Sequence, residues 1–428
     1  MATDCLSRPR SPKRPIAARY FVCACMTLAS ANTVSAQGPA PVPALTENDV
    51  VARALRRAPL ADMLDGAVVA QEGRGRAASA YPNPQILYMR EQTFGAFGTG
   101  EDYLSVAQTI DLGNRRALYG EAGEVRARAT RREGDAVRLS VAADTRHRFY
   151  EVLYRQMRVT ALESWVGHVT EALTIVIRRE QRGDVATYDR RRLEREQAVA
   201  TGRLATDQAA LERAQARLQA IIGVVTSPWI VEGMLLPTAE PAAVQTLRAS
   251  SRSRPDLLAL GMQIEAASLD RIAASRWWLP DLRLEGGWKG IDLGAGMRTD
   301  GFLLGGSLSI PLWDRSSGVA RIAEGETRAA RGRRALLESE LDGELDGARA
   351  EAVRLRRAAA ELRKQTSSAS GDLVRMSSVG YEGGELGILE LLDAYRGAAE
   401  DDLNALDMAQ SARRARIELD RLTGAGLP

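Results

Sequence analysis

The stretch YEGGELGILELLDAYR, Tyr381–Arg396, joins a glycine-marked turn to a run of leucines with acidic residues among them. Earlier in the chain, RGDVATYDRRRLER, Arg182–Arg195, again places a glycine before a small apolar step and a charged helical run. Glycine accepts a positive φ without steric cost, so each stretch is expected to reverse a helical hairpin. Gly384 follows Gly183 by 201 residues, which suggests that the chain builds the same hairpin tip twice.

Three further pairs of landmarks repeat at a similar offset. They are Tyr81–Ile86 with Trp278–Leu282, Thr109–Arg115 with Ser309–Arg315, and Ile222–Gly223 with Thr423–Gly424. Two unrelated hairpins that share turn residues are the alternative, and they would have to match at every one of these places. The pattern therefore predicts an internal duplication, with a first repeat over residues 37–245 and a second over residues 246–428.

Each repeat contains two candidate strands, which are predicted at about 85–93 and 102–111 and at about 281–290 and 301–311. Alternation with a period of two is clearest in the third strand, where Leu282, Leu284, Gly286 and Trp288 alternate with Asp281, Arg283, Glu285 and Lys289. We expect a glycine-rich link, Gly290–Gly301, between the third and fourth strands. Each strand should present one apolar face and one polar face.

Long helices are predicted at about 114–182, 185–223, 315–380 and 386–424, and no proline interrupts the two longer ones. Leu204, Leu211 and Leu218 recur every seven positions, while Asp207 interrupts a parallel series of Leu193, Ala200 and Ala214. Such seams pack helices side by side as in a coiled coil. Aromatic residues make up only 5% of the chain and charged residues 26%, which favours long helices over a thick core.

Residues 1–36 are typical of a secretory signal peptide, with a basic front, a short apolar run and a small-residue cleavage site that ends at Ala36. An uncleaved anchor or a disordered tail is the alternative. All three cysteines, Cys5, Cys23 and Cys25, lie in this leader, so the exported chain would have no disulfide and no thiolate metal site. It would keep 53 basic and 54 acidic residues, a net charge of about −1 that gives no argument for nucleic acid.

No later segment has the roughly 20 apolar residues of a spanning helix, so any membrane crossing would be made by strands. The chain offers four strands, whereas membrane barrels need about eight or more and an open edge in lipid leaves backbone groups unsatisfied. Several copies must therefore pool their strands. Apolar faces would meet lipid, and the water-facing positions would be Arg283, Glu285, Lys289, Ser307 and Ser309.

Three tryptophans, Trp277, Trp278 and Trp313, fall at strand ends on one side, where an aromatic girdle is expected in a membrane barrel. The alternative for each of them is an ordinary contact with a core or a helix. Strand alternation beside them favours the girdle.

Several motifs together resemble the TolC family of outer-membrane efflux proteins, from about Leu45 to Gly424. They are PNPQI followed by SVAQTIDLGNRR, LPDL followed by GGSLSIPLWDR, and the tip sequences GDVATYD and YEGGELGILELLDA. The resemblance implies a mainly α fold with transmembrane β strands: a homotrimer with a barrel of about 12 pooled strands in the outer membrane, continuous with a periplasmic α-barrel of coiled-coil hairpins. It also implies a passive channel that works with a periplasmic adaptor (membrane fusion protein) and an inner-membrane pump, of the RND type, in a Gram-negative-type bacterium.

The resemblance assigns roles to individual tip residues. Those matching an adaptor-docking surface are Gly183, Val185, Thr187, Gly384 and Leu386. Glu390 and Asp393 match an acidic ring that narrows the entrance in some members, and an ordinary solvated helix face is the alternative. Their counterparts 201 residues earlier are Asp189 and Arg192, so such a ring would come from one tip only.

Asp189 and Tyr381 match a hydrogen-bonded latch between neighbouring hairpins. The arginine that often joins this latch is replaced by Leu386, so Asp189 is expected to pair instead with Arg190 or Arg182, or the entrance to be held less firmly.

Nothing in the chain indicates enzymatic activity, a cofactor or a metal site. The only histidines, His147 and His168, are 21 residues apart on one predicted helix, and each is expected to be a surface or packing residue. There is no HExxH motif, phosphate-binding loop or nucleophile elbow. A soluble periplasmic adaptor or scaffold, and an exit duct for type I protein secretion, remain alternatives. The cargo could be a drug, a metal cation or a protein, although QTIDLGNRR resembles the CzcC-like metal-efflux branch.

Overall fold

The computed structural model describes residues 44–95, 98–225, 228–294, 296–313 and 315–426, which belong to one compact unit. The predicted signal peptide, residues 1–36, lies outside the described residues. Among the described residues, no helix is both long enough and apolar enough to cross a membrane.

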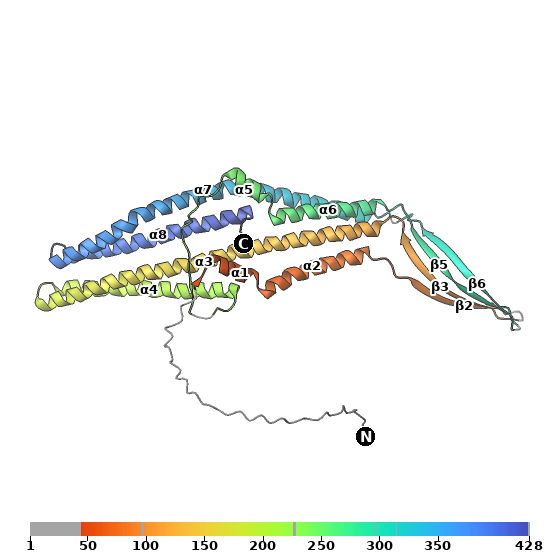
Figure 1. Cartoon of the computed structure of the whole chain (residues 1–428), viewed down its shortest axis with the longest axis horizontal. Coiled ribbons are helices and arrows are strands. Elements are labelled where there is room, and N and C mark those ends of the chain that lie inside the picture. The colour runs from red at the N-terminus through yellow and green to blue at the C-terminus, as the bar shows by residue number, and fades with distance from the viewer. Residues whose placement is uncertain (1–43, 96–97, 226–227, 295, 314, 427–428) are drawn as a thin grey trace, which may run out of the picture. The chain divides into compact units, whose positions relative to one another are not determined.

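The same series of elements occurs twice along the chain (Figure 1). The first series is α2 (Ala58–Ser79), β2 (Gln85–Gln92), β3 (Gly100–Asp111), α3 (Arg115–Arg182) and α4 (Thr187–Ile222). The second is α6 (Pro255–Ser275), β5 (Asp281–Asp292), β6 (Arg298–Ser309), α7 (Ser317–Gly383) and α8 (Ile388–Thr423). The helices α4 and α8 both have 36 residues, and α3 and α7 have 68 and 67. The duplicated, mainly helical fold is confirmed, whereas the division between residues 245 and 246 stays a prediction.

The four longer strands form one antiparallel sheet in the order β2-β3-β5-β6. Both repeats contribute to it, because β3 of the first pairs with β5 of the second along its whole length, from Gly100 opposite Asp292 to Asp111 opposite Asp281. The edge strands β2 and β6 each have one neighbour within the described chain. In Figure 1 the sheet lies at one end of the helices, and the two hairpin turns lie at the other end.

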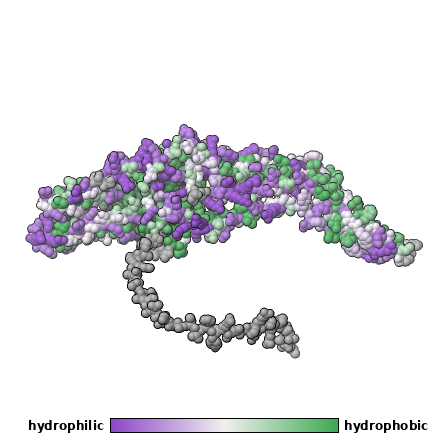
Figure 2. All heavy atoms as spheres, viewed as in Figure 1, coloured by the Kyte–Doolittle hydropathy of each residue, from purple (hydrophilic) through white to green (hydrophobic). Residues whose placement is uncertain are grey.

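The register of the sheet collects most of its large apolar side chains on one face. Leu104 lies opposite Trp288, which lies opposite Phe302, and the alternation repeats along the strands. The exposed apolar side chains of this face are Ile86, Tyr88, Leu104, Val106, Leu284, Trp288, Phe302, Leu304 and Leu308. Figure 2 shows hydrophobic residues in green over much of the visible surface of the sheet.

The opposite face of the sheet is more polar and partly paired, although Leu87 and Met89 of β2 lie on it and are exposed. Lys289 Nζ lies 2.7 Å from Glu101 Oε2, and the Ser105 hydroxyl donates to the Glu285 carboxylate. Both pairs link β3 to β5. The sheet is therefore amphipathic, as the alternation in the sequence predicts.

The turn between β5 and β6 is shorter than the sequence suggests. Instead of a link over Gly290–Gly301, β5 continues to Asp292 and β6 begins at Arg298. Gly294 and Gly296 have φ values of 81° and 80°, and the Leu293 N–H donates to the Met297 carbonyl at 2.9 Å. Glycine thus forms a tight turn rather than a long link. The sequence predicted β6 at 301–311, three residues late at its start and two at its end.

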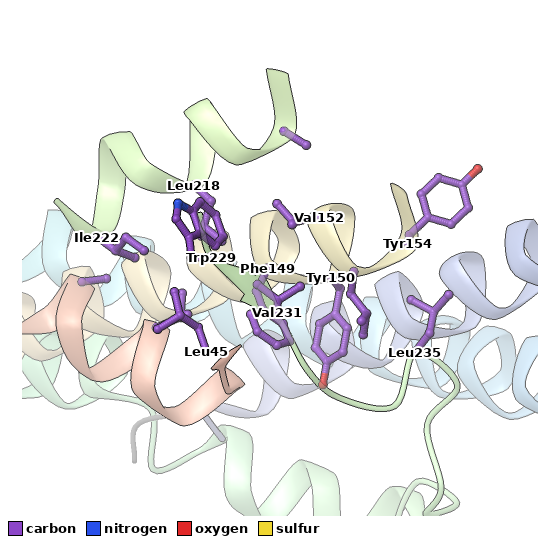
Figure 3. Close-up of a cluster of buried hydrophobic side chains, with 14 of the residues drawn as sticks. Leu45, Phe149, Tyr150, Val152, Tyr154, Leu218, Ile222, Trp229, Val231 and Leu235 are labelled. Carbon is purple, nitrogen blue, oxygen red and sulfur yellow. The ribbon is translucent and has the colours of Figure 1, made fainter. Parts of the chain in front are cut away.

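Four short elements are absent from the sequence prediction. They are a parallel pair of two-residue strands, β1 (Ala44–Leu45) and β4 (Ile230–Val231), and the helices α1 (Glu47–Leu55) and α5 (Val244–Ser251). Figure 3 shows Leu45, Trp229 and Val231 converging on Phe149 of α3 within one buried cluster. This cluster joins the start of the first repeat to the segment that leads into the second.

Candidate functional site at the two hairpin turns

The two hairpin turns have the same backbone. Gly183 and Gly384 both adopt the left-handed conformation, with φ of 83° and 78°, directly after α3 and α7. In the first turn the Asp184 N–H donates to the Arg179 carbonyl at 2.9 Å, and in the second the Glu385 N–H donates to the Gly380 carbonyl at 2.8 Å. Each bond satisfies a carbonyl left free at the end of a helix. The donor of the second turn lies 201 positions after the donor of the first, and the two acceptors are separated by the same number of positions.

The residues predicted to dock an adaptor divide into two groups. Gly183, Thr187 and Gly384 are exposed. Val185 is half-buried against the apolar cluster beneath the turns, and Leu386 is 37% exposed. The Leu386 side chain packs against Gly380 near the end of α7. Its Cδ1 atom would lie only 2.8 Å from a Cβ added at that glycine. Their docking role stays a prediction.

An apolar cluster directly beneath the turns holds the two hairpins together. It combines side chains from α3, α4, α7 and α8, including Trp165, Leu193, Tyr381, Leu391 and Leu392. Because burial of such side chains is favourable only while the hairpins stay in contact, the cluster places the two tips side by side.

The predicted latch residues come close, but no hydrogen bond joins them among the described residues. Tyr381 is 3% exposed, and its hydroxyl has no hydrogen-bond partner in the described chain. Burial raises the pKa of Tyr381, the Asp189 carboxylate raises it further, and the Arg179 guanidinium opposes both effects. Asp189 is therefore near enough to affect the Tyr381 phenol without bonding to it.

An arginine that the sequence did not single out contacts Tyr381. Arg179 Nη1 donates to the Tyr381 carbonyl at 2.7 Å, and the guanidinium lies 5.2 Å from the centre of the tyrosine ring. The expected pairing of Asp189 with Arg190 is wrong, because Arg190 instead contacts Glu180 and Glu194, at 2.7 Å and 2.9 Å. No ion pair between Asp189 and Arg182 forms in the described chain either. No repeat signal marks Arg179, since its counterpart 201 residues later is Gly380.

The predicted constriction acids, Glu390 and Asp393, lie in the first turns of α8 and are exposed. Leu391 and Leu392, between them in sequence, face the apolar cluster. The Glu390 carboxylate reaches back over the start of the helix, because a Cβ added at Gly387 would lie 2.8 Å from Glu390 Oε2. A carboxylate there is favoured by the partial positive charge of a helix N-terminus. Their place in a pore constriction stays a prediction.

The predicted girdle tryptophans differ in exposure. Trp278 and Trp313 are 62% and 91% exposed, and they flank the start of β5 and the end of β6. Trp277 is half-buried, and the Arg315 guanidinium lies 5.7 Å from its ring centre. Trp277 thus makes a contact within the chain, whereas the other two rings are free to meet a different environment.

Among the described residues, no group of three or more His, Cys, Asp or Glu side chains could hold a metal ion. His168 lies 5.6 Å from the ring of Tyr395. Burial lowers the pKa of His147, the Glu418 carboxylate opposes this, and the Arg414 guanidinium adds to it. Both histidines occupy packed positions on α3.

Comparison with known proteins points to one family. Residues 247–425 match the model of the outer membrane efflux protein family. The chain is 25% identical to the cobalt-zinc-cadmium resistance protein CzcC of Cupriavidus metallidurans, over 82% of this chain and 84% of that protein. These matches, together with the structural neighbours, support an outer membrane factor of the TolC family.

Solved structures of membrane channels share the fold. The structure of CusC superimposes with a TM-score of 0.70 at 17% identity, over 89% of this chain and 92% of CusC. The open state of the MtrE outer membrane channel of Neisseria gonorrhoeae gives 0.69 at 20% identity, over 89% of each chain. The likeness extends over both repeats, although the family model matches only the second. The family consists of efflux channels rather than enzymes.

Proposed function

We propose that this protein is the outer-membrane channel of a tripartite efflux system, a passive conduit for substrates delivered by an inner-membrane pump through a periplasmic adaptor. The observation that carries the proposal is the amphipathic four-stranded sheet, whose apolar face is exposed and whose two edges are unpaired in the described chain. Such a face is stable in lipid only if the backbone groups at the edges also find partners.

The direction of the edge strands supports assembly from several copies. Successive strands of the sheet are antiparallel, so β2 and β6 run in opposite directions. An antiparallel pair can therefore form between β6 of one copy and β2 of the next, and repeating this contact closes a ring. Three copies would pool about 12 strands, within the range of membrane barrels, so we propose a homotrimer in the outer membrane.

The polar face of the sheet suits a water-filled interior. In a closed barrel with its apolar face in lipid, Glu101, Ser105, Glu285 and Lys289 would line the lumen. Lys289 offsets the charge of Glu101, whereas Glu285 accepts from the neutral Ser105 hydroxyl, so these four residues keep one net negative charge in each copy. We propose that this small excess does not select the cargo, and that selection falls to the entrance and to the pump.

The two tips are the proposed docking surface for a membrane fusion protein, which would connect the channel to an RND-type pump. Gly384→Trp should weaken capture of the adaptor, because a bulky side chain would cover an exposed turn. The matched control is Gly397→Trp, an exposed glycine of α8 with open space around it. Co-purification of the adaptor from membranes measures the effect, and equal capture by both variants would contradict docking at the tip.

Divalent metal cations are the proposed cargo class. The supporting observation is the 25% identity over most of the chain to a protein named for cobalt, zinc and cadmium resistance. Deletion of the gene should lower the tolerated concentration of these metals. Unchanged metal tolerance with lowered drug tolerance would favour a drug channel, and loss of an exported protein would favour type I secretion.

A soluble periplasmic adaptor or scaffold is the rival from another class. Such a protein is expected to have one hairpin with small β domains, whereas here hairpin and strand pair occur together twice. Fractionation separates the two functions. We expect the protein in the outer-membrane fraction, released only by detergent, and recovery in the soluble periplasm would favour the adaptor.

A further inference from the structure

Two equivalent arginines, one in each repeat, have different surroundings where the sheet meets the helices. Arg115 and Arg315 lie 200 residues apart, each between a strand and the long helix that follows it. Arg115 is held between two carboxylates, since its Nη2 lies 2.6 Å from Asp281 Oδ1 and its Nε lies 3.4 Å from Asp111 Oδ1. The residue equivalent to Asp111 in the second repeat is Pro311. The second repeat therefore lacks one of the carboxylates that neutralise this arginine in the first.

Arg315 presents its charge beside an aromatic ring. The residue is exposed, and its guanidinium lies 5.7 Å from the ring centre of Trp277. It forms no ion pair with the described residues; Asp314, directly before it, lies outside them. Contact with an aromatic ring orients a guanidinium without removing its charge. Arg315 thus keeps N–H donors that an anion from the surroundings can reach.

A groove between α6 and α7 extends this basic surface. It has a volume of about 480 Å³, and its charged lining residues are Arg271, Arg321, Glu324, Arg328 and Arg331. The formal net charge of the lining is therefore +3. Glu324 contacts Arg328 at 2.8 Å, whereas the other three arginines are exposed and unpaired in the part of the chain that the structure describes.

Two of these groove arginines lie close to the sheet. Arg271 is four residues before the end of α6, and Arg321 is four residues after the start of α7, which is about 6 Å along each helix. Arg331 is 14 residues after that start, about 21 Å away along α7. Arg271, Arg315 and Arg321 therefore form the part of the basic surface nearest the strand ends.

The strand ends beside these arginines expose apolar side chains. The exposed residues there are Trp278, Leu308, Ile310, Leu312 and Trp313. A water-soluble anion would use the arginines alone and leave this apolar surface uncovered. A ligand that suits both surfaces carries an anionic group and hydrocarbon chains.

We propose that this region of the second repeat binds an anionic phospholipid of the inner leaflet, with the phosphate at Arg271, Arg315 and Arg321 and the acyl chains on the apolar strand ends. The inference rests on the proposed outer-membrane channel, which places the helices in the periplasm and this end of the sheet at the inner leaflet. A guanidinium binds phosphate through two parallel N–H donors. Three arginines also carry more charge than one phosphate offsets, so a lipid without an ammonium group is preferred.

Native mass spectrometry tests the proposal on protein purified from outer membranes in detergent, freed of lipid and mixed with equal amounts of phosphatidylglycerol and phosphatidylethanolamine. Both lipids carry a phosphate, but only the first has a net negative charge. The wild type should bind mainly phosphatidylglycerol. The variant Arg271→Gln/Arg315→Gln/Arg321→Gln should lower the ratio of bound phosphatidylglycerol to bound phosphatidylethanolamine by about tenfold.

Two further variants make the test specific to the charge at this place. The control Arg56→Gln/Arg213→Gln/Arg217→Gln removes the same charge from exposed arginines of α1 and α4 that form no ion pair within the described residues, and it should keep the wild-type ratio. The variant Arg271→Lys/Arg315→Lys/Arg321→Lys keeps the charge and should keep most of the preference. If the lysine variant binds lipid as the glutamine variant does, attraction of the headgroup is not the cause and the proposal is overturned.

Inorganic phosphate distinguishes a lipid site from a site for free anions. Added at the same concentration as phosphatidylglycerol, it should leave the lipid bound, because the free ion has no acyl chains to pack on the strand ends. Displacement of the lipid by inorganic phosphate would assign the arginines to a soluble anion and overturn the lipid site.

The same spectra separate this inference from the proposed function, because they also give the mass of the assembly. A monomer that stays stable when the detergent is removed overturns both. Trimers that bind the two lipids equally, or a glutamine variant that binds like its control, overturn the inference alone. If the triple glutamine variant does not fold, Arg315→Gln should give a smaller decrease in the ratio, and an unchanged ratio would count equally against the proposal.

Discussion

At the scale of single residues, charged side chains inside the helical seams find partners on neighbouring helices. Asp207 interrupts an apolar series on α4 and is only 7% exposed. Arg158 Nε and Arg155 Nη1 of α3 lie 2.9 Å and 3.2 Å from its Oδ1, and Arg158 Nη1 continues to Asp407 of α8 at 2.9 Å. A buried carboxylate without such partners would be strongly destabilising. The interruption therefore marks a polar link between three helices.

A titratable residue on α3, His147, makes the stability of the fold depend on pH. His147 has a pKa below its ordinary value of 6.5, mainly because burial disfavours the charged imidazole. Between the lowered folded pKa and 6.5 the unfolded chain binds more protons than the folded chain, so stability falls as the pH drops through this window and is fully present above it. We expect the wild type to lose more thermal stability than His147→Gln between about pH 7.5 and about pH 5.

Thermal unfolding in detergent at several pH values measures this difference. Carboxylates also titrate near the lower limit, but they are common to both proteins and cancel in the comparison. Parallel curves for the wild type and His147→Gln across the whole range would show that His147 does not contribute.

At the scale of elements, the strands and hairpins could be predicted because their signals are local. Alternation placed β2, β3 and β5, and glycine placed both turns, so that the described boundaries of these strands and the four hairpin helices lie within three residues of the predicted ones. The pairing of β1 with β4 could not be predicted, since two residues at 44–45 carry no periodicity and their partner lies at 230–231. The short β5–β6 turn was missed because glycine fits both a link and a tight turn.

The candidate site was predictable to the same extent. The positive φ of Gly183 and Gly384 follows from the residue type, and the exposure of Glu390 and Asp393 follows from the leucines between them. The contact of Arg179 with Tyr381 joins residues 202 positions apart, and no local pattern indicates it. Long-range polar contacts of this kind depend on how the hairpins pack, which the sequence pattern does not specify.

A close approach between two helices gives a prediction at this scale. A Cβ added at Gly123 of α3 would lie 2.4 Å from the Cα of Gly75 in α2, and one added at Gly75 would lie 3.0 Å from the Cα of Gly123. Backbone atoms on both sides cannot give way without moving a helix. We expect Gly123→Ala to lower the free energy of unfolding by about 1–3 kcal/mol.

The control for this prediction is Gly167→Ala on the same helix, where nothing lies within 4 Å of the added Cβ. Alanine is favoured over glycine in a helix by about 1 kcal/mol, so this variant should be as stable as the wild type or more stable. Thermal or denaturant unfolding of both variants makes the comparison. If Gly123→Ala is the more stable of the two, the close contact between α2 and α3 does not exist in solution.

At the scale of the whole molecule, the helices bury their apolar surface within one chain, whereas the sheet does not. The helical hairpins bury their own seams and hold each other through shared apolar clusters. The sheet instead exposes a continuous apolar face and ends in two unpaired strands within the described chain. Exposed apolar surface of this kind is rare on soluble monomers, and open strand edges favour pairing with another chain. The account therefore requires both lipid and further copies of the same protein.

Native mass spectrometry of the protein extracted from outer membranes in detergent tests this requirement most directly. The account predicts one dominant species with the mass of three exported chains, because each sheet needs a neighbour at both edges. A dominant species with the mass of one chain, stable when the detergent is removed, would contradict it.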